Sequence, residues 1–211
     1  MPQHFPTNGN VLMTFVTPML ARRWPDSADL NRRLREVILE VERRDQGMER
    51  SNAGGWHSKD DLFRWEDPAI AELLQRVMAG TQEITHQVCG EAVKGRDAEL
   101  AVSGWANVSR DRNYNILHNH LRYTWSGVYY VALGESDPAA RDSGAIEFLD
   151  PRLGIDHDLL PGGSSGPFLR LTPEPGLMLM FPSWLQHWVR PFQGRGERIS
   201  IAFNVTLKFP D

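Results

Sequence analysis

Two histidines spaced two residues apart are the leading candidates for chemistry in this sequence. His118 and His120 flank Asn119, and the preceding residues 114–117 can lead into a strand. Because side chains at i and i+2 of a strand face the same side, both imidazoles can converge on one ion. His187 lies in an apolar and aromatic segment, where the alternative is a hydrogen-bonded histidine of the core. Together the three histidines predict a metal site.

An arginine and a serine follow on a strand-like segment. Arg198 opens the run that ends at Asn204, and it lies eleven positions after His187. Arg198 and Ser200 share one face of such a strand. An inward arginine beside a hydroxyl can receive a carboxylate, because its guanidinium donates two parallel charge-assisted hydrogen bonds. An exposed arginine at a sheet edge is the alternative, but it leaves the spacing unexplained.

The elements that must position these side chains change character near residue 96. Before it, residues 29–44 and 67–89 carry apolar residues at helical spacing. After it, stretches rich in β-branched and aromatic residues predict strands over 100–109, 124–133, 144–149, 168–171, 177–181, 187–190 and 198–207. Dense glycine and proline between these stretches is typical of a sandwich, barrel or jelly roll. We therefore expect a mainly β chain with flanking helices, of the α+β class.

Length and composition exclude several classes of protein. The chain has 211 residues, 41% hydrophobic and 24% charged, which predicts one globular domain. Its net charge of −4 gives no basic field for nucleic acid, and no apolar stretch is long enough to span a membrane. The single cysteine, Cys89, and the lack of a secretory signal predict a cytoplasmic protein.

The sequence resembles the Fe(II)- and 2-oxoglutarate-dependent oxygenases, and within them a bacterial and phage subgroup. That family has His-x-Asp/Glu on one strand, a distant His, and an Arg or Lys further on that is often followed by x-Ser. These positions are filled by His118, His187, Arg198 and Ser200. Ser126–Val131 and Ser143–Arg152 resemble the strands after the first ligand pair. Ser51–Ser58 resembles an N-terminal motif of the subgroup, whose role the residues do not reveal.

The resemblance implies a fold and a reaction. The fold is an eight-stranded double-stranded β-helix, a cupin-like jelly roll with N-terminal helices packed on it. Residues 1–211 would form a single oxygenase domain, with a helical flank over 1–96 and the β core over 97–211. The implied enzyme is a dioxygenase that uses Fe(II), O₂ and 2-oxoglutarate. It couples the oxidative decarboxylation of 2-oxoglutarate to hydroxylation of a substrate.

The resemblance also implies roles for individual side chains. The metal would be held by His118, His120 and His187. The cosubstrate would be contacted by Arg198, Ser200, Tyr130 and Asn107. For the last two there are structural alternatives, which are a tyrosine packed in a sheet and an asparagine at a strand bend.

One position departs from the family pattern. His120 stands where the family has a carboxylate, so three neutral imidazoles would leave the charge of the metal ion uncompensated. Three-histidine iron sites exist in related β-barrels, and spacing favours His120 as the third ligand. The candidate replacement carboxylates are Asp111, Glu147 and Asp150.

Two other functions are compatible with these residues. A cupin-like metal enzyme would use the histidines for zinc or iron without 2-oxoglutarate, which leaves Arg198 and Ser200 without a role. A non-enzymatic jelly-roll module would bind a ligand and keep the histidines in its core. The sequence identifies neither the substrate, which a small molecule or a peptide could provide, nor the oligomeric state.

Overall fold

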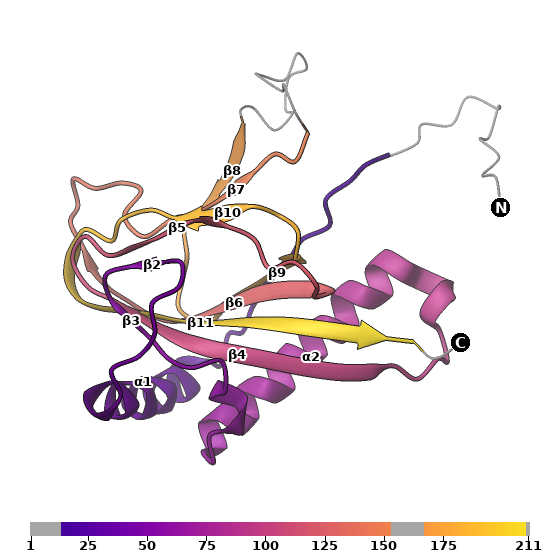
Figure 1. The fold of residues 1–211 in the computed structure, drawn as a ribbon, viewed down its shortest axis with the longest axis horizontal. Coiled ribbons are helices and arrows are strands. Elements are labelled where there is room, and N and C mark those ends of the chain that lie inside the picture. The colour runs from indigo at the N-terminus through magenta and orange to yellow at the C-terminus, as the bar shows by residue number, and fades with distance from the viewer. Residues whose placement is uncertain (1–13, 153–166, 210–211) are drawn as a thin grey trace.

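Two antiparallel β-sheets face each other, and two α-helices cover one of them (Figure 1). The computed structural model describes residues 14–152 and 167–209. The larger sheet contains, in spatial order, β1 (Leu20–Arg23), β9 (Leu177–Pro182), β6 (Trp125–Ser136), β11 (Gly194–Lys208), β4 (Glu99–Ser109) and β3 (Trp56–His57). The smaller sheet contains β2 (Asn52–Ala53), β5 (Tyr114–His118), β10 (His187–Val189), β7 (Ile146–Leu149) and β8 (Phe168–Leu171).

The eight strands from β4 to β11 build the double-stranded β-helix, with four strands in each sheet. The strands expected after residue 96 are present, with ends that differ by a few residues. The stretch over 1–96 was expected to be a helical flank, but it also supplies β1, β2 and β3 at the sheet edges. Strands of two to four residues are too short to show an alternating pattern in the sequence.

Both predicted helices are present. α1 spans Ala28–Arg44 and α2 spans Pro68–Cys89. The proline at the first position of α2 needs no hydrogen-bond partner, and the Asp67 carboxylate accepts a hydrogen bond from the backbone N of Ala69 at 2.7 Å. α2 ends at Gly90, whose φ of 52° favours glycine. Two short 3₁₀ helices are formed by Leu62–Arg64 and Gly90–Val93.

The larger sheet is buried on both faces. On β6, Tyr129 and Val131 belong to the core under the helices, whereas Val128 and Tyr130 belong to the core between the sheets. A strand buried on both faces reads as a nearly continuous apolar run, as this one does. Polar side chains on the face of the larger sheet that is directed toward the smaller sheet are therefore exceptions in an otherwise apolar environment.

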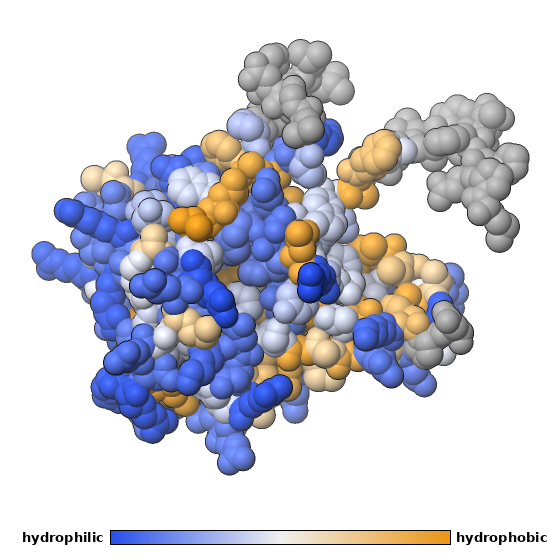
Figure 2. Space-filling view, viewed as in Figure 1, coloured by the Kyte–Doolittle hydropathy of each residue, from blue (hydrophilic) through white to orange (hydrophobic). Residues whose placement is uncertain are grey.

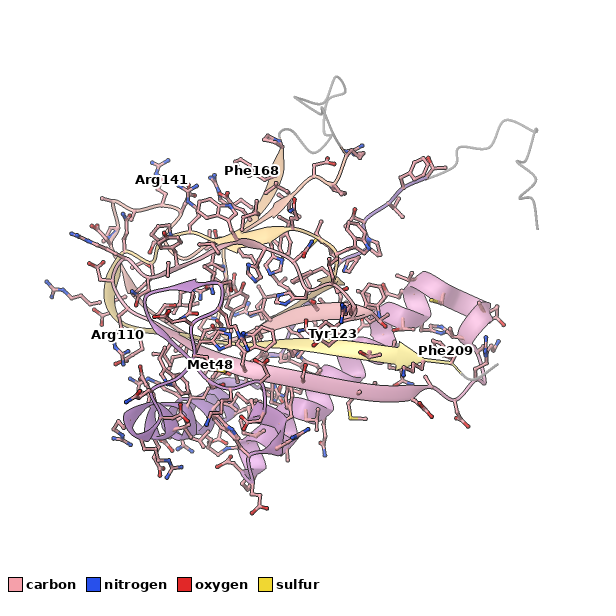
Figure 3. The ribbon with its side chains drawn as sticks, viewed as in Figure 1. Met48, Arg110, Tyr123, Arg141, Phe168 and Phe209 are labelled. Atoms are coloured by element: carbon pink, nitrogen blue, oxygen red, sulfur yellow. The ribbon has the colours of Figure 1, made fainter. Side chains whose placement is uncertain are left out.

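The surface seen in Figure 2 is largely hydrophilic, with apolar patches between hydrophilic residues. No helix among the described residues is long and apolar enough to cross a membrane. Side chains from both sheets fill the space between them (Figure 3), and the candidate site lies in that space.

Candidate metal centre

The three histidines singled out in the sequence converge between the two sheets. His118 ends β5 and pairs directly with His187, the first residue of β10. The ring centroids of His118 and His187 are 4.4 Å apart, and that of His120 lies 4.9 Å and 5.3 Å from them. One ligand nitrogen from each ring lies within 4.8 Å of the other two.

The expected strand geometry of His118 and His120 is wrong in one respect. β5 ends at His118, so His120 lies in the loop that follows and not on the same strand. The backbone N of His120 donates instead to the carbonyl oxygen of Ser183, at 2.8 Å. The loops before β6 and before β10 therefore bring His120 back to the site.

Two of the three imidazoles are oriented by backbone carbonyls. Nδ1 of His118 is 2.7 Å from the carbonyl oxygen of Ile116, and Nδ1 of His187 is 3.0 Å from that of Leu185. A carbonyl can only accept, so each Nδ1 carries the proton and each Nε2 keeps a lone pair for a metal ion. The ring of His120 makes no hydrogen bond within residues 14–152 and 167–209.

Burial keeps all three rings neutral. Burial, together with a smaller effect of the neighbouring histidines, lowers the pKa of His187 to about 3 and that of His120 to about 4. Burial also lowers the pKa of His118. Neutral imidazole is the form that binds metal, so the protein holds three available ligands.

None of the three carboxylates considered as replacements joins the histidines in the described part of the chain. Glu147 is only 1% exposed, and its carboxylate accepts hydrogen bonds from Arg170, Arg190 and Trp188. Asp150 pairs with Arg152 beside it. Asp111 accepts a hydrogen bond from the backbone N of Gly194 at 3.2 Å. Each carboxylate is thus held elsewhere.

A row of polar side chains crosses the inner face of the larger sheet. Ser200 on β11 is paired with Asn107 on β4 and with Tyr130 on β6. Arg198 lies two residues before Ser200 and is 2% exposed, so it is not an edge arginine. All four side chains are buried.

Three buried polar atoms in this row have no hydrogen-bond partner: Asn107 Oδ1, the Tyr130 hydroxyl and Arg198 Nε. The Arg198 guanidinium lies 5.4 Å from the centroid of the Tyr130 ring, and its Nη1 is 3.5 Å from Ser200 Oγ. No carboxylate of the described residues pairs with it. A buried cation without a counter-ion is costly, so this position suits an incoming anion.

Burial raises the pKa of the Tyr130 hydroxyl to about 12, so this group stays protonated and can donate to an anion. The three histidines and the four polar residues all line one cavity of about 40 Å³. A cavity of this size accommodates water. A metal at one end and a cation at the other suit a dicarboxylate that chelates the metal and places its second carboxylate on Arg198.

Two residues beside the histidines were not recognised in the sequence. His57 is 3% exposed, and its ring stacks on Trp105 with the ring centroids 5.4 Å apart. Trp105 also contacts the ring of His120, with the ring centroids 5.5 Å apart. The signal available in the sequence was the Ser51–Ser58 motif that contains His57.

Residues 103–204 match the family model described as "Putative 2OG-Fe(II) oxygenase". Comparison with curated proteins gives no match. Among solved structures, a prolyl-4-hydroxylase of Pseudomonas putida superposes with a TM-score of 0.58 at 17% identity, covering 89% of this chain and 91% of that one.

HygX of Streptomyces hygroscopicus, solved with nickel and 2-oxoglutarate bound, gives a TM-score of 0.60 at 14% identity, covering 90% of this chain and 83% of that one. A Trichoplax adhaerens prolyl hydroxylase, solved with a peptide fragment, gives a TM-score of 0.58 at 11% identity. The superposition covers 89% of this chain and 83% of that one. At such identities these likenesses establish the fold.

The segment that matches the family model contains all three candidate ligands, His118, His120 and His187, and also Arg198 and Ser200. Its fold is the double-stranded β-helix of the solved relatives. Residues 103–204 are therefore similar to the Fe(II)- and 2-oxoglutarate-dependent oxygenases, and the chain shares the fold of solved members of that family. The cofactors of that family are iron and 2-oxoglutarate.

Proposed function

We propose that the protein is a 2-oxoglutarate-dependent hydroxylase whose iron is held by His118, His120 and His187. The convergence of three neutral imidazoles, with ligand nitrogens within 4.8 Å of one another, carries the proposal. Three protein ligands leave open positions for 2-oxoglutarate and O₂ on a six-coordinate iron. When bound, the iron supplies the chemistry that couples decarboxylation of 2-oxoglutarate to hydroxylation.

The cosubstrate would be held between the three histidines and Arg198, which line the same cavity. One carboxylate and the ketone would chelate the metal, and the other carboxylate would pair with the Arg198 guanidinium and with the hydroxyl of Ser200. The unpartnered Tyr130 hydroxyl and Asn107 Oδ1 support contacts in the same cavity, although the Asn107 oxygen can only accept. The chelating carboxylate would offset one of the two positive charges that three neutral imidazoles leave on Fe(II), and the second carboxylate would neutralise Arg198.

The substrate is a small molecule or a peptide. Relatives with this fold have been solved with either kind of molecule: HygX with hygromycin B and the Trichoplax adhaerens enzyme with a peptide fragment. We also place the protein in the cytoplasm, in keeping with its single cysteine, Cys89, which cannot form an internal disulfide.

Succinate formation tests this function. Purified protein is incubated with Fe(II), ascorbate and 2-oxoglutarate in air, with His187→Ala as the matched control. We expect succinate from the unaltered protein only when Fe(II) is added, and none above background from the variant. Iron binding without binding of 2-oxoglutarate would instead identify a cupin-like metal enzyme, and failure to bind any metal would leave a ligand-binding jelly roll.

A further inference from the structure

The Ser51–Ser58 motif forms a strap that joins the edges of the two sheets. At one end, the Ser51 carbonyl accepts a hydrogen bond from the backbone N of Ile116 at 2.8 Å, beside the strand that carries His118. β2 then pairs with β5 of the smaller sheet, and β3 pairs with β4 of the larger one. The strap thus runs from the edge of one sheet to the edge of the other (Figure 1).

The motif residues fit this path. Gly54 and Gly55 make the turn between β2 and β3 with φ values of 70° and 72°, which favour glycine. A Cβ on Gly55 would lie 2.7 Å from the carbonyl oxygen of Val108, so the close approach to β4 also requires glycine. After the turn, Ser58 Oγ accepts a hydrogen bond from the backbone N of Ala106 at 3.0 Å.

The strap places His57 on the inner face of the larger sheet. His57 is paired with Asn107 in register, so its ring lies on the face that lines the cavity. Its Nδ1 is 2.6 Å from the carbonyl oxygen of Ser58, which fixes the ring. The ring stacks nearly parallel on Trp105, with an interplanar angle of 13° and centroids 5.4 Å apart.

Trp105 contacts both His57 and the candidate metal ligand His120. Its ring lies 5.5 Å from the ring of His120 at an angle of 46°. His118 and His187 are oriented by carbonyl groups, but His120 lies in a loop and its ring makes no hydrogen bond among the described residues. Ring packing is therefore the interaction available to orient the third ligand.

We propose that His57 is a positioning residue of the metal centre, which holds the ring of His120 in place through its stack on Trp105. The inference rests on the proposed metal site, and it gives the Ser51–Ser58 motif a role. The stack replaces the hydrogen bond that orients an imidazole ligand in most metal sites.

Calorimetric titration of Co²⁺ into metal-free protein tests the inference without requiring turnover. We expect His57→Ala to weaken Co²⁺ binding about 10-fold, the lower end of the loss when a residue behind a metal ligand is removed. His57→Phe keeps a ring against Trp105 and should bind Co²⁺ nearly as the unaltered protein does. His86→Ala, at an exposed histidine of α2, is the matched control and should change nothing.

Repeating the titration in a His120→Ala protein shows whether the loss of Co²⁺ affinity in His57→Ala depends on His120. In His120→Ala protein, which keeps two ligands, His57→Ala should cause no further loss of Co²⁺ affinity, because neighbouring residues acting through one group are not additive. Trp105→Leu should repeat both results, which covers the case in which His57→Ala does not fold. An equal loss in both backgrounds, or a His57→Phe variant as weak as His57→Ala, would overturn the inference. If the unaltered protein itself binds no Co²⁺, the proposed function fails instead.

Discussion

One buried cavity has the Arg198 guanidinium at one end and, at the other, three neutral histidines that could hold a metal ion. The guanidinium has no carboxylate partner among the described residues, and the imidazoles are neutral ligands that leave the charge of a metal ion uncompensated. Tyr130 stays protonated beside them because burial raises its pKa to about 12. Arg198, the Tyr130 hydroxyl and a metal ion held by the histidines would each favour an anion, and a dicarboxylate would satisfy both ends at once.

Replacing Arg198 tests the anion end alone. Arg198→Ala should weaken binding of 2-oxoglutarate by about 30- to 4000-fold, since losing a buried charge-assisted pair costs about 2–5 kcal/mol. Affinity for Fe(II) should be unchanged, because Arg198 is not a ligand. Titration of 2-oxoglutarate into iron-loaded protein without oxygen measures the first quantity. Arg112→Ala, at an 89% exposed arginine, is the matched control. Equal affinities in Arg198→Ala and the unaltered protein would contradict the carboxylate receptor.

The buried histidines also predict how the stability of the metal-free protein depends on pH. An unfolded histidine has a pKa near 6.5, whereas burial lowers that of His187 to about 3 and that of His120 to about 4. At a pH between these folded-state values and 6.5, the two histidines are protonated in the unfolded chain but not in the folded chain. The free energy of unfolding should therefore fall as the pH falls below about 6.5, by at most about 1.4 kcal/mol per pH unit for each histidine.

Urea unfolding of the metal-free protein between about pH 7.5 and 5 measures this slope, above the range where unfolded carboxyl groups titrate. A variant with His118→Asn, His120→Asn and His187→Asn should show a clearly shallower slope. The same slope in both proteins would mean that these histidines are not buried in neutral form.

At the scale of elements, the sequence predicted what depends on periodicity. The long strands β4, β6 and β11 and both helices carry enough residues to show their pattern, and the Arg198-x-Ser200 spacing on one strand face predicted two buried neighbours. The edge strands β2 and β3 have two residues each and show no pattern. The burial of His57 and the loop position of His120 depend on contacts between distant segments, which no local pattern encodes.

Gly144 shows how one loop position shapes the anion end of the cavity. It precedes β7 with a φ of 65°, and a Cβ there would lie 2.8 Å from Arg198 Nε. Gly144→Ala should therefore displace the guanidinium and weaken 2-oxoglutarate binding while leaving the charge in place. Gly196→Ala is the matched control, because Gly196 has a similar φ of 76° but a Cβ there would have 3.8 Å of clearance.

Both glycine variants should lose about 1–2 kcal/mol of stability from the left-handed backbone conformation. Only Gly144→Ala should also lose affinity in the 2-oxoglutarate titration. Equal affinities for 2-oxoglutarate in the two variants would show that the space beside Gly144 does not determine the position of the Arg198 guanidinium.

At the scale of the whole molecule, the helices complete the sheet that carries half of the site. Leu34 and Ile38 of α1, with Leu73 and Val77 of α2, are buried in one core with residues of β6, β9 and β11. The other face of the same strands carries Arg198, Ser200 and Tyr130. Removing support under the sheet should therefore affect the helical flank and the β core together, as the proposal of a single domain over 1–211 requires.

Leu34→Ala tests that coupling, because Leu34 is 0% exposed at the interface between α1 and the sheet. Deleting a buried leucine side chain typically costs about 2–5 kcal/mol, so the melting temperature should fall by several degrees. In a single domain, the helical circular dichroism and the absorption of Co²⁺ at the metal site should be lost in one shared transition, shifted equally by the variant. Leu117→Ala, at a leucine that is 46% exposed, is the matched control and should shift neither signal. If the helical signal moved to lower temperature while the Co²⁺ signal stayed in place, the helices would form a unit of their own.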